Sequence, residues 1–142
     1  MANVSITAGN VVKSTGSVIE TGIAGEAITA GQTVYKKAAD SQYYLADVDA
    51  EAVGDSAEID NVYGIALNGG SADQPLTVQK SGTITIGGTV VVGTVYVVSA
   101  TAGGIAPWAD LVSTDYVSIV GVATTAGTIA MSLNIAGVAI PS

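Results

Sequence analysis

Short runs in which apolar and small polar residues alternate, separated by glycine, recur along the whole chain. In the clearest run Ile129, Met131, Leu133 and Ile135 share one side of the backbone, and small or polar residues separate them. A period of two places alternate side chains on opposite faces of a strand, whereas a helix needs a period near 3.6. No segment keeps the helical period, and the 18 glycines favour turns. The sequence therefore predicts an all-β fold.

Ten segments fit this strand pattern and are bounded by turn residues. They are residues 4–7, 18–20, 33–38, 43–46, 62–67, 76–79, 83–86, 90–98, 116–123 and 129–135. Short helical turns are expected only at 46–60 and 107–114, where Pro107 suits the first helical position. We expect a small β-barrel or sandwich; alternation sets the faces of the strands and leaves the choice between these two open. Residues 1–24 are expected to form an extended N-terminal arm and the first strands, and residues 25–142 a single β domain.

The two halves of the chain show the same order of short motifs. Val34-Tyr35 and the later Gly64-Ile65-Ala66 are echoed by Val95-Tyr96 and Gly121-Val122-Ala123. Residues 33–82 and 94–137 are therefore a candidate internal repeat, in which two similar β-hairpin units share one core. Convergent strand and turn composition explains the echo equally well.

The missing residue types exclude several classes of function. The chain contains no Cys and no His, and its four basic residues are all lysine. Disulfides, thiol nucleophiles, imidazole bases and the usual zinc ligand sets are therefore absent. Its net charge of −8 repels phosphate backbones. We expect a protein that is not an enzyme, uses no cofactor and binds no nucleic acid.

The sequence also predicts neither secretion nor membrane insertion. Its first residues lack the basic and apolar regions of a secretory signal. Two stretches, 81–109 and 116–142, carry no charge and are long enough for a membrane helix. Because Gly, Thr and Ser recur every few residues in both, we interpret them as strands and expect no membrane partner.

Acidic residues are concentrated in one segment. Seven of the twelve acids lie between positions 40 and 60, and Asp47, Asp49, Glu51 and Glu58 match four positions of a calcium-binding loop. The sharp-turn position of that loop holds Ala52 instead of glycine, and the flanking residues are typical of strands. A solvated acidic loop is the favoured interpretation, with ion binding as the alternative.

The aromatic residues are six tyrosines and Trp108. Because Tyr43 and Tyr44 are adjacent in a predicted strand, their rings must face opposite sides. Filling the core is the favoured role for such rings. Tyr43, Tyr44 and Trp108 are also candidate subunit-interface residues, since Tyr and Trp are enriched at interfaces. A carbohydrate platform is the third interpretation.

Four segments that span most of the chain resemble the small head-decoration (cement) proteins of tailed bacteriophages. They read GEAITAGQTVYKKAADSQYYLAD, VYGIALNGG, PLTVQKSGTITIGGTVVVGTVYVVSATAGGIAP and YVSIVGVATTAG. The resemblance implies a β-rich, commonly homotrimeric protein on the outer surface of the virion, made in the host cytoplasm and bound to the major capsid protein. It implies no active site.

The same resemblance suggests that the N-terminal segment contacts the capsid. The positions concerned are Asn3, Val4, Ile6, Val11 and Lys13. A segment of this composition could add a strand to a neighbouring sheet, and the alternative is an edge strand within its own chain. The expected function is a structural virion protein that binds the major capsid shell and stabilises the expanded head. The alternative is a head-fibre or host-glycan-binding surface module.

Overall fold

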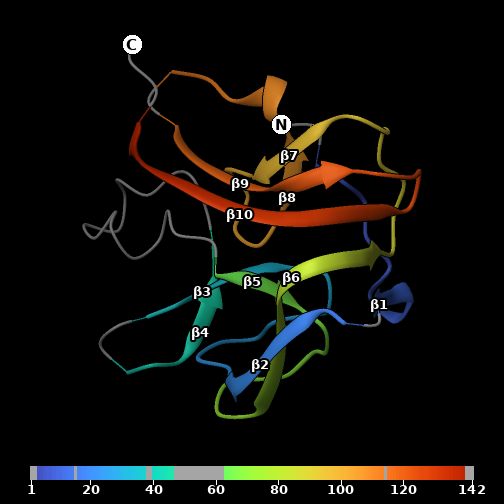
Figure 1. The fold of residues 1–142 in the computed structure, drawn as a ribbon. Coiled ribbons are helices and arrows are strands. Elements are labelled where there is room, and N and C mark those ends of the chain that lie inside the picture. Colours follow the sequence, from blue (N-terminus) through green and yellow to red (C-terminus); the bar gives the residue numbers. More distant parts are fainter. Residues whose placement is uncertain (1–2, 15, 38–39, 47–62, 114, 140–142) are drawn as a thin grey trace.

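The computed structural model describes residues 3–14, 16–37, 40–46, 63–113 and 115–139. These residues form ten β-strands and two short 3-10 turns (Figure 1). The strands are β1 (Val11–Lys13), β2 (Val18–Ile23), β3 (Thr33–Lys36), β4 (Tyr43–Leu45), β5 (Gly64–Ala66), β6 (Pro75–Ile86), β7 (Val95–Val98), β8 (Ile105–Pro107), β9 (Tyr116–Ala123) and β10 (Thr128–Ala139); the turns are η1 (Ala8–Asn10) and η3 (Trp108–Asp110). The predicted all-β class is confirmed.

The strands form one curled antiparallel sheet, shaped like half a barrel. Its order is β4-β3-β5-β6-β10-β9-β7-β8, and β1 and β2 also pair with β6. Two four-stranded units of the same pairing order meet where β6 pairs with β10: β4-β3-β5-β6 on one side and β8-β7-β9-β10 on the other. The segments 33–82 and 94–137 each cover most of one unit. A parallel bridge between Ala24, the residue after β2, and Tyr43 of β4 also connects these two strands.

Strand β6 connects the two units because it bends in the middle. Its first half pairs with β2 and β5, and its second half pairs with β1 and β10. At the bend Gly82 has a φ of +92°, which glycine adopts without steric cost. The Gln79 side-chain amide donates hydrogen bonds to the carbonyl oxygens of Ser81 and Thr83, at 3.2 and 3.1 Å. The two strands expected at 76–79 and 83–86 are therefore one bent strand.

Two hydrophobic clusters lie on the two sides of β3 and β5. Alternation sends Val34 and Ala66 into the smaller cluster, with Leu76 and Val78 of β6. The neighbouring Tyr35 and Ile65 enter the larger cluster, which also contains residues of β7, β8 and β10. These are Tyr96, Val98, Ile105, Ile129 and Met131. The larger core is therefore shared by both four-stranded units.

Several predicted boundaries differ from the observed ones. Residues 4–7 form no strand, and the run expected at 90–98 is a strand only from Val95. The sequence did not predict the three-residue strands β1 and β8. The turn expected at 107–114 is η3, with Pro107 preceding its first residue. The turn expected at 46–60 lies, after Ala46, outside the described residues.

Candidate functional site

The N-terminal segment, defined here as residues 3–8, lies along its own chain. The Val4 amide donates to the Ile105 carbonyl in β8, and the Thr7 amide donates to the Gly87 carbonyl after β6, both at 2.8 Å. The Asn3 side chain accepts a hydrogen bond from Ser99 Oγ. The segment thus bridges β8 and the end of β6, which matches the predicted alternative of a contact within the chain, although it is not assigned as a strand.

Three of the five predicted capsid-contact residues serve this intramolecular packing. Val4 and Ile6 pack against the larger core, and Val11 is buried in it. Asn3 and Lys13 are exposed. Val4, Ile6 and Val11 of the predicted arm are therefore part of the fold and face its core. Among the five positions, Asn3 and Lys13 present the most side-chain surface to a partner.

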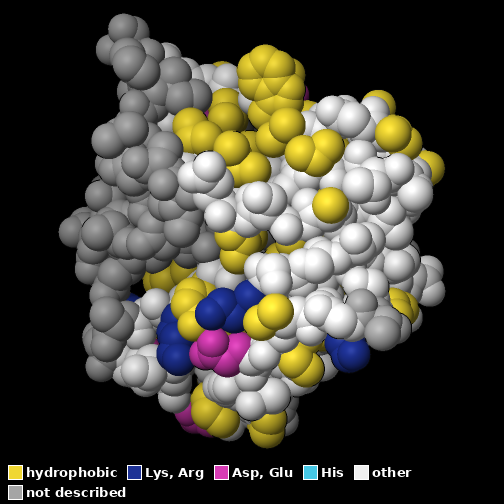
Figure 2. All heavy atoms as spheres, in the orientation of Figure 1, with side chains coloured by type: hydrophobic (Ala, Val, Ile, Leu, Met, Phe, Trp, Pro, Cys, Tyr) yellow, Lys and Arg dark blue, Asp and Glu magenta, His cyan; other side chains and the backbone are white. Residues whose placement is uncertain are grey.

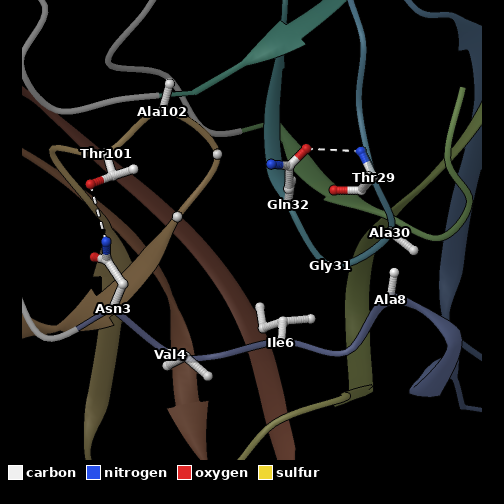
Figure 3. Close-up of a pocket in the computed structure, with 12 residues that line it drawn as sticks. Asn3, Val4, Ile6, Ala8, Thr29, Ala30, Gly31, Gln32, Thr101 and Ala102 are labelled. Atoms are coloured by element: carbon white, nitrogen blue, oxygen red, sulfur yellow. Dashed lines mark hydrogen bonds between the residues drawn. The ribbon is translucent and has the colours of Figure 1, made fainter. Parts of the chain in front are cut away.

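A groove of about 440 Å³ lies between the N-terminal segment and two turns, 29–32 and 101–104. Figure 3 shows Ile6 and Ala8 pointing from the segment toward Ala30 and Gly31. Gly31 is required here, since a Cβ would lie 2.5 Å from Ile6 Cγ2 and its φ is +92°. The described side chains of this groove carry no charge, so they supply no acid or base for catalysis.

A charged cluster joins β2 to two strands of the first unit, β3 and β6. Glu20 of β2 forms ion pairs with Lys36 of β3 at 3.1 Å and Lys80 of β6 at 3.4 Å. The hydroxyls of Tyr43 and Tyr63 also donate to its carboxylate, at 3.0 and 2.8 Å. In Figure 2 the basic and acidic side chains are concentrated in the lower half of the visible face, whereas hydrophobic side chains lie in both halves. We call these five residues the Glu20 cluster.

The cluster holds its groups in their ordinary charge states. Hydrogen bonds from Tyr63 and Lys36 lower the pKa of Glu20 to about 2. The hydrogen bond with Tyr63 raises the pKa of Lys80. Burial, followed by the hydrogen bond to Glu20, raises the pKa of the Tyr43 phenol. A carboxylate with so low a pKa is a poor proton carrier at neutral pH, so the arrangement is suited to binding strands together.

The three predicted interface aromatics occupy different environments. Tyr43 is completely buried in its own chain, so it fills the core and the prediction of an interface role for it is wrong. Tyr44 is half-buried and donates to Asp40 Oδ2 at 2.6 Å, and this hydrogen bond raises its pKa to about 12. Trp108 is 59% exposed. Of the three, Trp108 offers the largest free aromatic surface.

Trp108 borders an apolar pocket of about 390 Å³ on the outer face of β7 and β9, which we call the Trp108 pocket. Its lining comprises Val95, Val97, Trp108, Ala109, Leu111, Val117 and Ile119. Every one of these side chains is apolar. Exposed apolar surface of this kind is typical of places where other molecules dock.

The predicted calcium-loop residues Asp47, Asp49, Glu51 and Glu58 lie outside the described residues. Within the described ranges, no three His, Cys, Asp or Glu residues are grouped so that they could hold a metal ion. The helical turns found there are too short to span a membrane.

Sequence reasoning missed the Glu20 cluster entirely. Glu20 lies 16 positions from Lys36 and 60 from Lys80, so no local motif connects them. From the sequence, Trp108 was named as a candidate interface residue, although core filling was favoured for the aromatic residues, and no pocket was predicted. Comparisons of the chain with protein-family models, curated proteins and solved structures find no match.

Proposed function

We propose that this protein is a structural virion protein that binds the outer surface of the major capsid shell and stabilises the expanded phage head. The motif resemblance supports this role. The structural observation that best supports the proposed role is the exposed apolar surface at the Trp108 pocket. Burying this surface against a partner would lower the free energy. In this proposal the protein has no catalytic role and acts as a homo-oligomer. The resemblance implies that the oligomer is a trimer.

The physical mechanism is linkage. If this protein binds the expanded shell more tightly than the unexpanded shell, its binding stabilises the expanded state by mass action. When each copy or oligomer touches more than one shell subunit, avidity raises the apparent affinity by roughly 10²–10⁴. Heat and internal pressure must then break several contacts together.

Two measurements test the proposal. Quantitative mass spectrometry of purified virions should find the chain in near-stoichiometric ratio to the major shell protein. Purified protein should also bind expanded shells and raise their temperature of disruption, with much weaker binding to unexpanded shells. Absence from virions, or equal binding to both shell forms, would contradict the proposed role.

The N-terminal contact needs a test that leaves the fold intact. Deleting the segment would remove Val4 and Ile6 from the core and confuse two effects. Charge reversal at the exposed Lys13 avoids this problem, and Lys37→Glu makes the same change of charge at a half-buried lysine that also contacts the Tyr44 ring. If Lys13 contacts the capsid, as the resemblance implies, Lys13→Glu weakens shell binding several-fold and Lys37→Glu does not. Equal effects would remove Lys13 from the contact.

The alternative function is a head-fibre or host-glycan-binding surface module. The exposed Trp108 ring favours it, since sugars stack on exposed aromatic faces. Glycan-array binding that Trp108→Ala abolishes, in a variant with an unchanged circular dichroism spectrum, would support this function. Few copies per virion would agree with it, whereas hundreds would favour decoration.

A further inference from the structure

One asparagine of the chain is followed by glycine. Asn68 precedes Gly69, whereas the other four asparagines precede valine or isoleucine. These four are Asn3, Asn10, Asn61 and Asn134. In an Asn-Gly pair the backbone nitrogen of the glycine can attack the side-chain amide carbon of the asparagine and close a succinimide ring. A β-branched residue in place of the glycine hinders this approach, because its two branches crowd the backbone.

The fold holds the Asn68 side chain by three hydrogen bonds. The Thr77 amide of β6 donates to Asn68 Oδ1 at 2.6 Å. Asn68 Nδ2 donates to the carbonyl oxygens of Pro75 and Gly69, at 3.1 and 3.3 Å. Ring closure moves the amide carbon onto the Gly69 nitrogen and expels Nδ2, so the bonds that hold the amide must break as the reaction proceeds.

The other reacting groups are available at this position. Gly69 is exposed, and its amide donates no hydrogen bond to another described residue. Asn68 is half-buried and lines a shallow groove of about 330 Å³ together with Thr77 and residues of β1 and β2. The attacking nitrogen is therefore free and solvent reaches the site, so the hydrogen bonds of the side chain are the restraint on the reaction.

We propose that Asn68 is a site of spontaneous deamidation, which these hydrogen bonds suppress in the folded protein. The Gly69 nitrogen gives its proton to solvent and bonds to the Asn68 side-chain carbon, and Nδ2 leaves as ammonia. Water then opens one of the two C–N bonds of the succinimide and yields aspartate or isoaspartate. The net reaction consumes one water, releases one ammonia and involves no oxidation or reduction. It is independent of the proposed function, so either can fail without the other.

The aspartate product disturbs the connection between β5 and β6. An oxygen replaces Nδ2 and faces the carbonyl oxygens of Pro75 and Gly69, which have then lost their donor. Two attractive contacts become repulsive, and polar groups that lose their partner destabilise the fold. The reaction thus loosens the turn that suppressed it.

The isoaspartate product lengthens the main chain by one methylene at position 68. The chain is fixed on both sides of this position. The Leu67 amide donates to the Thr77 carbonyl at 2.8 Å, and the Gly70 amide donates to the Ile28 carbonyl at 2.9 Å. An extra main-chain atom between these two hydrogen bonds shifts one of them out of place, so this product also opens the turn.

Ageing of the purified full chain in mildly alkaline buffer, folded and in concentrated urea, tests the suppression. Peptide mapping by mass spectrometry reports the loss of each amide. In urea Asn68 should react well before Asn10 and Asn134, and Gly69→Ala should remove this lead. In the folded protein Asn68 should react at least about tenfold more slowly than in urea, since hydrogen bonds must break. Equal rates in the two states would overturn the proposal, as would another asparagine that reacts first in urea.

Hydrogen exchange connects the slower reaction to this site. The Thr77 amide donates to Asn68 Oδ1, so one opening event frees both groups. Folding should therefore slow deamidation of Asn68 at least as strongly as it slows exchange of the Thr77 amide. A smaller effect on deamidation would show that the reaction proceeds with the hydrogen bonds in place and would overturn the proposed restraint.

Asn68→Asp reproduces the aspartate product directly. Its midpoint of urea unfolding should lie below that of the wild type, and exchange of the Leu67 and Gly70 amides should be faster. Asn134→Asp is the matched control, because it makes the same change of charge at an exposed residue of β10. Equal midpoints for the two variants would mean that the product fits the turn and would overturn its proposed opening.

Discussion

Glu20 shows how one carboxylate joins strands that are distant in the sequence. It accepts hydrogen bonds from residues of β3 and β6 and from two tyrosines, so β2 is tied to strands beyond its neighbour β6. Its side chain is 30% exposed, and solvent screens part of the interaction. Its contribution to stability is therefore modest and depends on pH.

We expect Glu20→Gln to destabilise the protein by about 1 kcal/mol at pH 7. The folded-state pKa of Glu20 is lowered to about 2, so its stabilisation is complete above the ordinary carboxyl pKa of about 4.3 and disappears as the pH falls through 2. Urea unfolding from pH 7 to pH 2 should show the two proteins converging below pH 4. Asp73→Asn is the control, because asparagine also accepts its φ of 70°. A constant difference across this range would contradict the pKa assignment.

Gln79 has a comparable role at the bend of β6. Its side chain is completely buried, and its amide nitrogen binds two carbonyl oxygens on either side of Gly82. Gln79→Met keeps the length and removes both donors, so we expect a loss of about 1–3 kcal/mol, measured by urea unfolding. Gln42→Met, at a half-exposed position, should change stability by less than about 0.5 kcal/mol. Equal losses would show that the bend does not depend on the amide.

At the scale of elements, close strand approach at two glycines shapes the sheet. A Cβ on Gly64 of β5 would overlap Val78 of β6, and one on Gly121 of β9 would overlap the carbonyl of Ala130 in β10. Both glycines occupy the third strand of their four-stranded units. The sequence echo that includes these two glycines therefore coincides with a shared packing requirement.

We expect Gly121→Ala to cost about 1–3 kcal/mol or more, since the backbone of β10 must move to admit a methyl group. Gly127→Ala is the control, because nothing lies within 4 Å of a Cβ there. Thermal unfolding measures both. Hydrogen exchange in Gly121→Ala should be fastest in β9 and β10. Similar stability of the two variants would mean that the strands separate without cost.

At the scale of the whole molecule, the larger core prevents the two units from unfolding independently. It contains Tyr35 and Ile65 of the first unit and Tyr96, Ile105 and Ile129 of the second. β6 also belongs to both pairing systems. Loss of either unit would expose core surface of the other, so cooperative unfolding is expected.

Amide hydrogen exchange should therefore yield one common opening free energy for the slowest amides of β5 and β9. Urea unfolding followed by near-ultraviolet and far-ultraviolet circular dichroism should give coincident transitions. Two separated transitions would indicate two domains and would contradict the prediction that residues 25–142 form a single one.

The candidate sites were predictable to different degrees. Trp108 was named as an interface candidate from its aromatic character alone, but the pocket beside it depends on Val117 and Ile119 across the sheet. Tyr43 and Tyr44 were correctly expected to face opposite sides, but local sequence does not show which side is covered. Burial depends on what packs above a strand, and here Glu20 and Tyr63 cover Tyr43.

The sequence by itself determined the all-β class and the absence of histidine and cysteine chemistry. An apolar period of two can be recognised within a single segment, and the composition can be interpreted without knowing which segments are in contact. The tertiary structure decided the bend of β6, the packing of residues 3–8 on β8, the Glu20 cluster and the Trp108 pocket. These features depend on which strands pair. Pairing is a choice among contacts far apart in the chain, and the alternating pattern of one strand fits many partners equally well.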